Sequence, residues 1–281
     1  MVDPHRSLLH RWITMRVIRS ADLVLVDSHV QRRAVLSLGC SPQKIILFPW
    51  VDLKDLTDTI PDPSFRDRLG WHDKIIVVSV RKHEPNYAVD TLIRAVPVAL
   101  ATAPNLRFLV FGSGTQTARL VRLAQELRVK KFVHFAGTVP RGNLLRYVKD
   151  CDIYASTSVT DGTSSSLVEA MSLGIPVVVT SIAGNVEWVA DGVNGLMFNK
   201  GDSQALARAI VRLVVNRLES ECMARRARKE IDERVKWELA SKELINRMYC
   251  LCSKYAARQP NARRILRCCS QTLKQEGFPV R

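Results

Sequence analysis

A loop rich in glycine and serine lies between two carboxylates in residues 159–181, which read VTDGTSSSLVEAMSLGIPVVVTS. The amide groups of a helix's first turn have no partner inside the helix, and the helix dipole favours an anion there. The segment therefore predicts a site for a phosphate-bearing ligand at the start of a helix.

Three other strand-like runs end in loops that suit the same ligand. Arg81 follows the run at 74–80, Gly112 and Gly114 lie at the end of 106–112, and Gly137 and Thr138 lie at the end of 131–137. Each glycine taken alone predicts only a turn. Because ligands bind at the carboxyl ends of parallel strands, the loops together predict one ligand site at that edge of a sheet.

The elements that must position these loops alternate along the chain. Apolar residues between the strand-like runs recur at three- and four-residue steps, which predicts helices. We therefore expect an α/β fold with a doubly wound parallel sheet over residues 51–217, covered by helices on both faces. The predicted strands are 74–80, 106–112, 131–137, 152–157 and 176–181.

The flanking segments have different patterns. Residues 1–50 predict helices and two strands, with Ser28 as a helix cap, and two strands are too few for an independent doubly wound domain. A further helix is predicted to begin at Asp202 or Ser203. Helices are expected over 218–252, and a basic, solvated tail over 253–281.

The charge of the chain narrows the class of partner. Its 281 residues include 42 Lys and Arg against 27 Asp and Glu, a formal net charge of +15. This favours nucleotides, nucleic acid or acidic lipid headgroups. Nucleic acid is not the expected partner, because no module that reads nucleic acid is recognised. No membrane-spanning run or signal peptide is found, so we expect a cytoplasmic protein that could contact the anionic inner face of a membrane.

The cysteines do not predict a metal site. There are seven, an odd number without a regular framework, which favours a reducing compartment over a disulfide scaffold. Cys250, Cys252, Cys268 and Cys269 lack the paired spacing of a zinc site. We expect neither a metal ion nor a cofactor.

The loop at 159–181 and the residues after it closely resemble the retaining glycosyltransferases of the GT-B fold, the group 1 or family-four-like glycosyl transferases. Members carry an acid, seven residues, Glu-Ala-Met, a Gly-x-Pro-Val-Val strand, a Gly-rich loop, and a second Glu before Asp-Gly-x-Asn-Gly. Weaker similarity extends from about residue 21 to about residue 252. The matching positions here are Asp161, 169–171, 174–178, Gly184, Glu187 and 191–195.

The resemblance implies a site for a nucleoside diphosphate sugar and roles for individual residues. Arg81 would neutralise the diphosphate and Asp161 would contact the transferred sugar, so these two are the catalytic candidates. Glu169 would accept the ribose hydroxyl groups. The other donor-binding candidates are Ser164 and Ser165, whose amides would hold phosphate oxygens, Gly137 and Thr138 near the base, and Gly112, Gly114, Gly162 and Thr163.

Three departures from the family pattern bear on these roles. The first acid is Asp161 where most members have Glu, so its reach toward the sugar is shorter. Tyr87 stands where many members have Lys, and the neighbouring Lys82 is expected to point away from the site. The sequence at 49–52, PWVD, lacks the glycine of the family's hinge turn.

Residues 1–50 resemble only the end of the family's amino-terminal lobe, which binds the acceptor. We therefore expect a donor-binding half with an incomplete amino-terminal lobe, whose exposed strand edges favour a partner chain or self-association through residues 1–50. Three interpretations remain open. The chain transfers a hexose with retention to a glycan, lipid or small molecule, or it is a nucleotide-sugar-binding subunit that needs a partner chain, or it is an inactive fragment.

Overall fold

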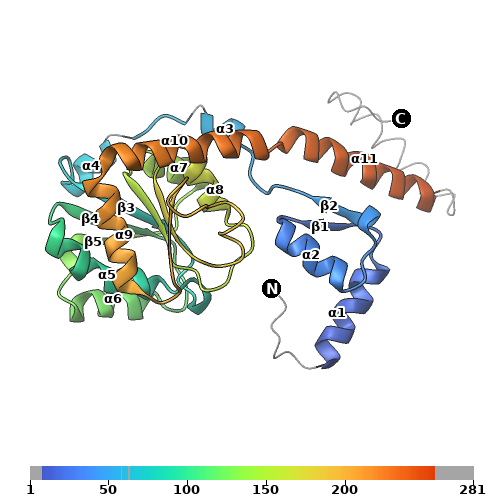
Figure 1. Ribbon diagram of the computed structural model, residues 1–281, viewed down its shortest axis with the longest axis horizontal. Helices are drawn as coiled ribbons and strands as arrows, with labels where there is room; N and C mark the ends of the chain where they lie inside the picture. Colours follow the sequence, from blue (N-terminus) through green and yellow to red (C-terminus); the bar gives the residue numbers. More distant parts are fainter. Residues whose placement is uncertain (1–7, 58, 63, 257–281) are drawn as a thin grey trace. The chain divides into compact units, whose positions relative to one another are not determined.

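The computed structural model describes residues 8–57, 59–62 and 64–256 (Figure 1). The chain forms two compact units, which are described separately. The larger unit is Val51–Val235, and the smaller one combines Val2–Trp50 with Lys236–Arg281. The basic tail predicted over 253–281 lies outside the described residues from position 257 onward.

The larger unit contains a six-stranded sheet in which every neighbouring pair is parallel. The strand order is β5-β4-β3-β6-β7-β8, so the chain winds outward from β3 in one direction and from β6 in the other. The two halves of the sheet meet where β3 pairs with β6, which is where open α/β sheets bind ligands. The strands are β3 Ile75–Val80, β4 Leu106–Phe111, β5 Val133–Gly137, β6 Ile153–Ser156, β7 Val177–Thr180 and β8 Leu196–Phe198.

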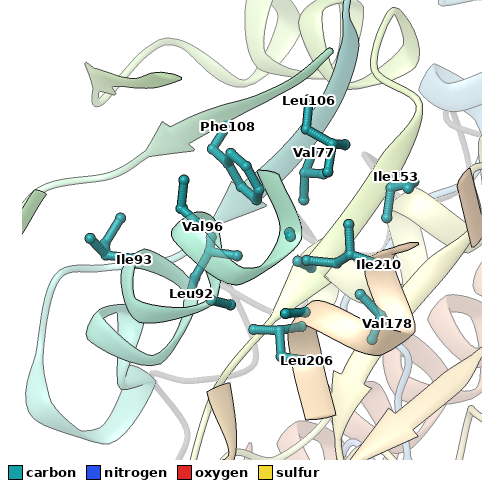
Figure 2. Close-up of a cluster of buried hydrophobic side chains, with 14 of the residues drawn as sticks. Val77, Leu92, Ile93, Val96, Leu106, Phe108, Ile153, Val178, Leu206 and Ile210 are labelled. Atoms are coloured by element: carbon teal, nitrogen blue, oxygen red, sulfur yellow. The ribbon is translucent and has the colours of Figure 1, made fainter. Parts of the chain in front are cut away.

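Apolar side chains on both faces of this sheet explain why its strands read as continuous apolar runs. Val77 packs into one core with Leu92 and Ile210, whereas its neighbours Ile76 and Val78 pack into the core on the opposite face. Figure 2 shows the first of these cores, to which residues from strands and covering helices contribute. Burial on both faces is typical of parallel sheets and confirms the predicted α/β fold.

Helices cover each face of the sheet (Figure 1). On the first face lie α5 Val89–Thr102, α6 Thr117–Glu126 and α9 Ser203–Val215. On the opposite face lie α4 Ser64–Leu69, α7 Arg141–Lys149, α8 Ser165–Ser172 and α10 Arg217–Arg234. Asp202 caps α9 by accepting a hydrogen bond from the Ala205 amide at 2.8 Å, as predicted. The short elements of this unit are α3 Lys54–Thr57, η2 Pro85–Tyr87 and η3 Lys130–Phe132.

The sixth strand, β8, was missed by the sequence prediction. It has only three residues, and it follows the Asp-Gly-x-Asn-Gly motif at 191–195. In that motif Asn194 accepts a hydrogen bond from the Ala190 amide at 2.8 Å, and Asp191 accepts one from the Met197 amide at 2.7 Å. The motif therefore builds the turn that leads the chain into β8.

The smaller unit pairs β1 Val24–Val26 with β2 Ile45–Leu47 in parallel. The predicted cap is confirmed, because Ser28 accepts a hydrogen bond from the Gln31 amide at the start of α2. The aromatic ring of Phe48 contacts that of Trp237 with centroids 5.0 Å apart. The helices of this unit are α1 Leu8–Ser20, α2 His29–Ser37, η1 Pro42–Lys44 and α11 Trp237–Ala256.

The two long helices near the carboxyl end, α10 and α11, belong to different units. We expected one region of carboxyl-terminal helices over residues 218–252. In the structure α10 belongs to the larger unit and α11 to the smaller one. Within the described ranges, no helix combines the length and the apolar character needed to cross a bilayer.

Candidate functional site

A cavity of about 500 Å³ opens at the carboxyl edge of the sheet in the larger unit. It lies beside the ends of β3, β4 and β5 and beside the loop that joins β6 to α8. Its lining comes from separate parts of the sequence that the strand order brings to one edge. The lining residues are Val80, Arg81, Lys82, Tyr87, Phe111, Gly112, Ser113, Gly137, Thr138, Val139, Leu144, Asp161, Thr163, Ser164, Ser165, Ser166 and Glu169.

Most residues selected from the sequence line this cavity. Of the eleven candidates, only Gly114 and Gly162 are absent from the lining. A Cβ atom at Gly114 would stand 2.6 Å from the His83 carbonyl oxygen, so this glycine permits close packing between two loops. The carbonyl oxygen of Gly162 lies 2.0 Å from where a Cβ atom of Gly184 would stand, so it marks another close loop contact. Both positions therefore support the site by packing at its margin.

Arg81 is held in one orientation at the centre of the site. It follows β3 directly, and its side chain is 8% exposed. Its guanidinium donates to the Ser156 hydroxyl at 3.0 and 2.9 Å and also to the Ser164 hydroxyl, and it lies 3.0 Å from a carboxylate oxygen of Asp161. It also lies over the ring of Tyr87, 5.6 Å from the centroid. These contacts preorganise a positive charge beside the cavity.

The start of α8 faces the same cavity. Ser164 is the N-cap, and its hydroxyl accepts a hydrogen bond from the Leu167 amide at 3.2 Å. Ser165 and Ser166 form the first turn and line the cavity. Amide groups in a first turn have no acceptor within the helix and suit the oxygen atoms of a phosphate. Arg81 and the start of α8 thus supply two kinds of anion-binding group to one cavity.

Glu169 lies one turn further along α8 and is almost entirely buried, with 9% of its side chain exposed. Burial raises the pKa of its carboxyl group, and the nearby guanidinium of Arg141 opposes this shift. The Arg141 Nη1 atom lies 2.7 Å from Glu169 Oε1. A buried carboxylate at a cavity wall can accept hydrogen bonds from ligand hydroxyl groups.

Arg141 was missed by the sequence analysis. It is the first residue of α7, which follows the edge strand β5, whereas Glu169 lies on the helix after the central strand β6. No local pattern connects the two positions, since the contact depends on how α7 and α8 pack on one face of the sheet.

Lys82 is among the residues that line the cavity, although its side chain was expected to point elsewhere. The strand β3 ends at Val80, so Lys82 belongs to the following loop. The alternation of side chains between the two faces of a strand does not extend to that position. Tyr87 also lines the cavity, where it packs against Arg81.

Opposite charges are nearly balanced in this site. Arg81 and Lys82 line the cavity together with Asp161 and Glu169. Arg81 forms an ion pair with Asp161. Glu169 forms an ion pair with Arg141, which is not a lining residue. The first turn of α8 and Lys82, whose charge also acts on the nearby carboxylate of Glu84, lie outside these two ion pairs. Among residues 8–57, 59–62 and 64–256, no cluster of three or more His, Cys, Asp or Glu forms a metal-binding set.

Known proteins are similar to this chain in sequence and in fold. A GDP-mannose-dependent monoacylated alpha-(1-6)-phosphatidylinositol monomannoside mannosyltransferase from Corynebacterium glutamicum is 26% identical over 234 residues, covering 80% of this chain and 61% of that protein. A D-inositol 3-phosphate glycosyltransferase from a Mycobacterium species is 32% identical over 195 residues, covering 66% of this chain and 43% of that protein. The chain thus spans between two fifths and two thirds of the length of these relatives.

Solved structures agree in fold. Anabaena Alr3699/HepE, crystallised with UDP-glucose, matches with a TM-score of 0.76 at 23% identity, covering 86% of this chain and 67% of that one. A sucrose-phosphate synthase from Thermosynechococcus elongatus matches with a TM-score of 0.71 at 23% identity, covering 87% and 62% of the two chains. The family model for glycosyl transferases group 1 matches residues 62–230, more than half of the chain. The chain therefore belongs to the glycosyl transferases group 1 family, and its structural neighbours are GT-B proteins.

Proposed function

We propose that this chain transfers a hexose from a nucleoside diphosphate sugar to an acceptor hydroxyl with retention of configuration. The observation that carries the proposal is the convergence of Arg81, the first turn of α8 and Glu169 on one cavity. A diphosphate suits the first two groups, and a ribose suits the third. Relatives named for GDP-mannose and a neighbour crystallised with UDP-glucose support a hexose donor with uracil or guanine as its base.

The chemistry required of the protein is stabilisation of a departing anion. The bond between the sugar's anomeric carbon and the diphosphate oxygen breaks, and its electron pair leaves with the diphosphate. The acceptor oxygen forms a bond to the same carbon on the same face, and its proton goes to the departing diphosphate. Fixed positive groups near that oxygen stabilise the transition state more than the bound donor, because further negative charge develops on the departing oxygen as the bond breaks.

Individual side chains divide this work. Arg81, Lys82 and the Ser165 amide stabilise the diphosphate, and their combined charge and hydrogen bonds make a metal ion unnecessary. Asp161 contacts the hydroxyl groups of the transferred sugar in this proposal, which is supported by its place beside Arg81 in the cavity lining. Glu169 accepts hydrogen bonds from the ribose.

Calorimetric titration with UDP, GDP and ADP tests donor binding. The proposal expects one diphosphate to bind with a dissociation constant below about 1 mM, equivalent to roughly 4 kcal/mol. Radiolabelled UDP-glucose and GDP-mannose, offered with glycan, lipid and inositol phosphate acceptors, test transfer. Absence of binding by all three diphosphates at millimolar concentration counts against the proposal.

A second candidate function is binding of the nucleotide sugar by a subunit that needs a partner chain for transfer. This candidate is favoured because every residue that lines the cavity belongs to the larger unit. The charged and polar groups of that lining suit the nucleotide part of the donor. The two candidates differ in a transfer assay with and without a candidate partner. Donor binding without transfer, followed by transfer when the partner is added, selects the second.

A further inference from the structure

The ion pair between Arg141 and Glu169 joins a residue outside the cavity to one inside it. The Nη1 and Oε1 atoms are 2.7 Å apart, and 48% of the Arg141 side chain is exposed against 9% for Glu169. Arg141 is not among the residues that line the cavity. Its contact with the cavity lining is this ion pair with Glu169.

The surroundings of Glu169 make its ionisation costly. Its helix packs within an apolar core, and α10 contributes Ala227 and Ile231 to that core. Burial is the largest influence on Glu169 and raises its pKa, and Arg141 is the charged group that counteracts this effect.

Other polar and charged groups near α8 are engaged elsewhere. Arg81 and Asp161 pair with each other in the cavity lining, and Tyr154 of β6 shares a hydrogen bond with Ser166. Lys82, on the loop after β3, is exposed at the cavity. On α10, Arg228 lies against Gly174 beyond the carboxyl end of α8. Arg141 is the charged group whose guanidinium contacts the Glu169 carboxylate and opposes the rise in its pKa.

The ionisation state of Glu169 matters for the ligand. An ionised carboxylate accepts hydrogen bonds with both oxygen atoms, and such charge-assisted bonds are roughly twice as strong as neutral ones. A protonated carboxyl group must use one oxygen as a donor. A ribose that offers two neighbouring hydroxyl groups therefore binds the ionised form better.

We propose that Arg141 is the positioning residue for Glu169: its guanidinium holds Oε1 and keeps the carboxylate ionised, so that the side chain can accept the ribose hydroxyl groups. This inference rests on the proposed function only for the identity of the ligand. The effect of Arg141 on Glu169 is a property of the protein without ligand.

The ligand-free property is tested by NMR titration of glutamate carboxyl carbons in the full chain, with the Glu169 signal assigned by its loss in Glu169→Gln. The midpoint for Glu169 should move to higher pH in Arg141→Gln and return toward the wild-type value in Arg141→Lys, which restores the positive charge. Arg119→Gln removes one positive charge from the surface of α6 and should leave the midpoint unchanged. An unchanged midpoint in Arg141→Gln overturns the inference.

The consequence for binding is tested with UDP and GDP across a range of pH. The pKa of Glu169 is raised, so binding that needs its ionised form is present above that pKa and is lost as the pH falls through it. In Arg141→Gln this loss should begin at higher pH, with affinity falling up to about tenfold per pH unit below the pKa. The pH profiles of Arg141→Lys and Arg119→Gln should follow that of the wild type.

The positioning role of Arg141 and the proposed nucleotide ligand can be tested independently. If Glu169→Gln weakens nucleotide binding but Arg141→Gln keeps the wild-type midpoint and pH profile, the inference is wrong and the proposed function stands. If the midpoint shifts in Arg141→Gln but neither nucleotide binds the wild type, the positioning role stands and the proposed ligand is wrong.

Discussion

The guanidinium of Arg81 lies 3.0 Å from a carboxylate oxygen of Asp161, although one residue follows β3 and the other lies in the loop after β6. The contact spans the point where the two halves of the sheet meet. The side chains are 8% and 18% exposed, so solvent screens the pair only in part. Any anion that binds Arg81 must share it with Asp161.

This sharing predicts opposite effects of Asp161→Asn on binding and on transfer. Diphosphate affinity should be equal to wild type or several-fold tighter, because Arg81 no longer divides its charge with a carboxylate. Transfer should fall by about a hundredfold or more if the carboxylate acts on the sugar in the transition state. Calorimetry with the diphosphate and a single-turnover transfer assay measure the two effects. Loss of diphosphate affinity would show that Asp161 chiefly maintains the local structure.

Arg81 and Glu169 should differ in which part of the donor they affect. Arg81→Ala should lower the affinity for the nucleoside diphosphate by roughly 10- to 100-fold and leave the affinity for the nucleoside almost unchanged. This is the effect expected from loss of a charge-assisted hydrogen bond to phosphate. Glu169→Ala should weaken both, because the ribose is common to them. Competition binding with the matched pairs uridine and UDP, and guanosine and GDP, measures the contrast. Equal losses for both ligands in both variants would assign the two residues to folding.

Lys82 should contribute to phosphate binding although Tyr87 occupies the neighbouring wall. Lys82→Gln is expected to lower the affinity for the diphosphate by about three- to tenfold. It should also make that affinity less dependent on salt concentration, since salt screens an exposed charge. Lys74→Gln is the matched control, because Lys74 precedes the opposite end of the same strand. Calorimetry at two salt concentrations checks this. Identical results for the two variants would show that Lys82 does not contribute to diphosphate binding.

Metal removal should not affect the donor site. In the proposed function, Arg81, Lys82 and the first turn of α8 take the place of a divalent ion beside the diphosphate. Dialysis against EDTA should leave the diphosphate affinity and any transfer rate the same as in the untreated protein. A loss on EDTA treatment that is restored by Mg²⁺ or Mn²⁺ contradicts this prediction.

The helix α1 should govern self-association of the chain. Leu9, Trp12 and Val17 are 62%, 56% and 61% exposed, whereas Ile18 packs against the small core of the same unit. A double variant, Trp12→Glu with Val17→Glu, should therefore shift the protein toward the monomer without unfolding it. Arg11→Glu, on the same helix, is the charge control. Sedimentation velocity over a range of concentrations measures the shift, and a wild-type chain that is monomeric throughout contradicts it.

Local features of the sequence were sufficient to predict the elements that hold the site. The β-branched runs that became β3, β4, β6 and β7 are buried on both faces, so their apolar character alone identifies them. Helix caps such as Ser28 and Asp202 are equally local, because each side chain bonds an amide three residues away. The loops after these strands could be assigned to one edge because parallel strands place their carboxyl ends together.

The remaining features depend on contacts between distant segments. The strand β8 has three residues and is defined by its pairing with β7, so its own pattern is too short to predict it. Lys82 lies in the loop at the cavity because β3 ends two residues before it, and only the folded backbone decides where the strand ends. Arg141 meets Glu169 because α7 and α8 pack on the same face of the sheet. The sequence by itself determined which residues could bind a phosphate and a ribose, whereas the tertiary structure decided which charges oppose one another there, because ion pairs depend on distances across the fold.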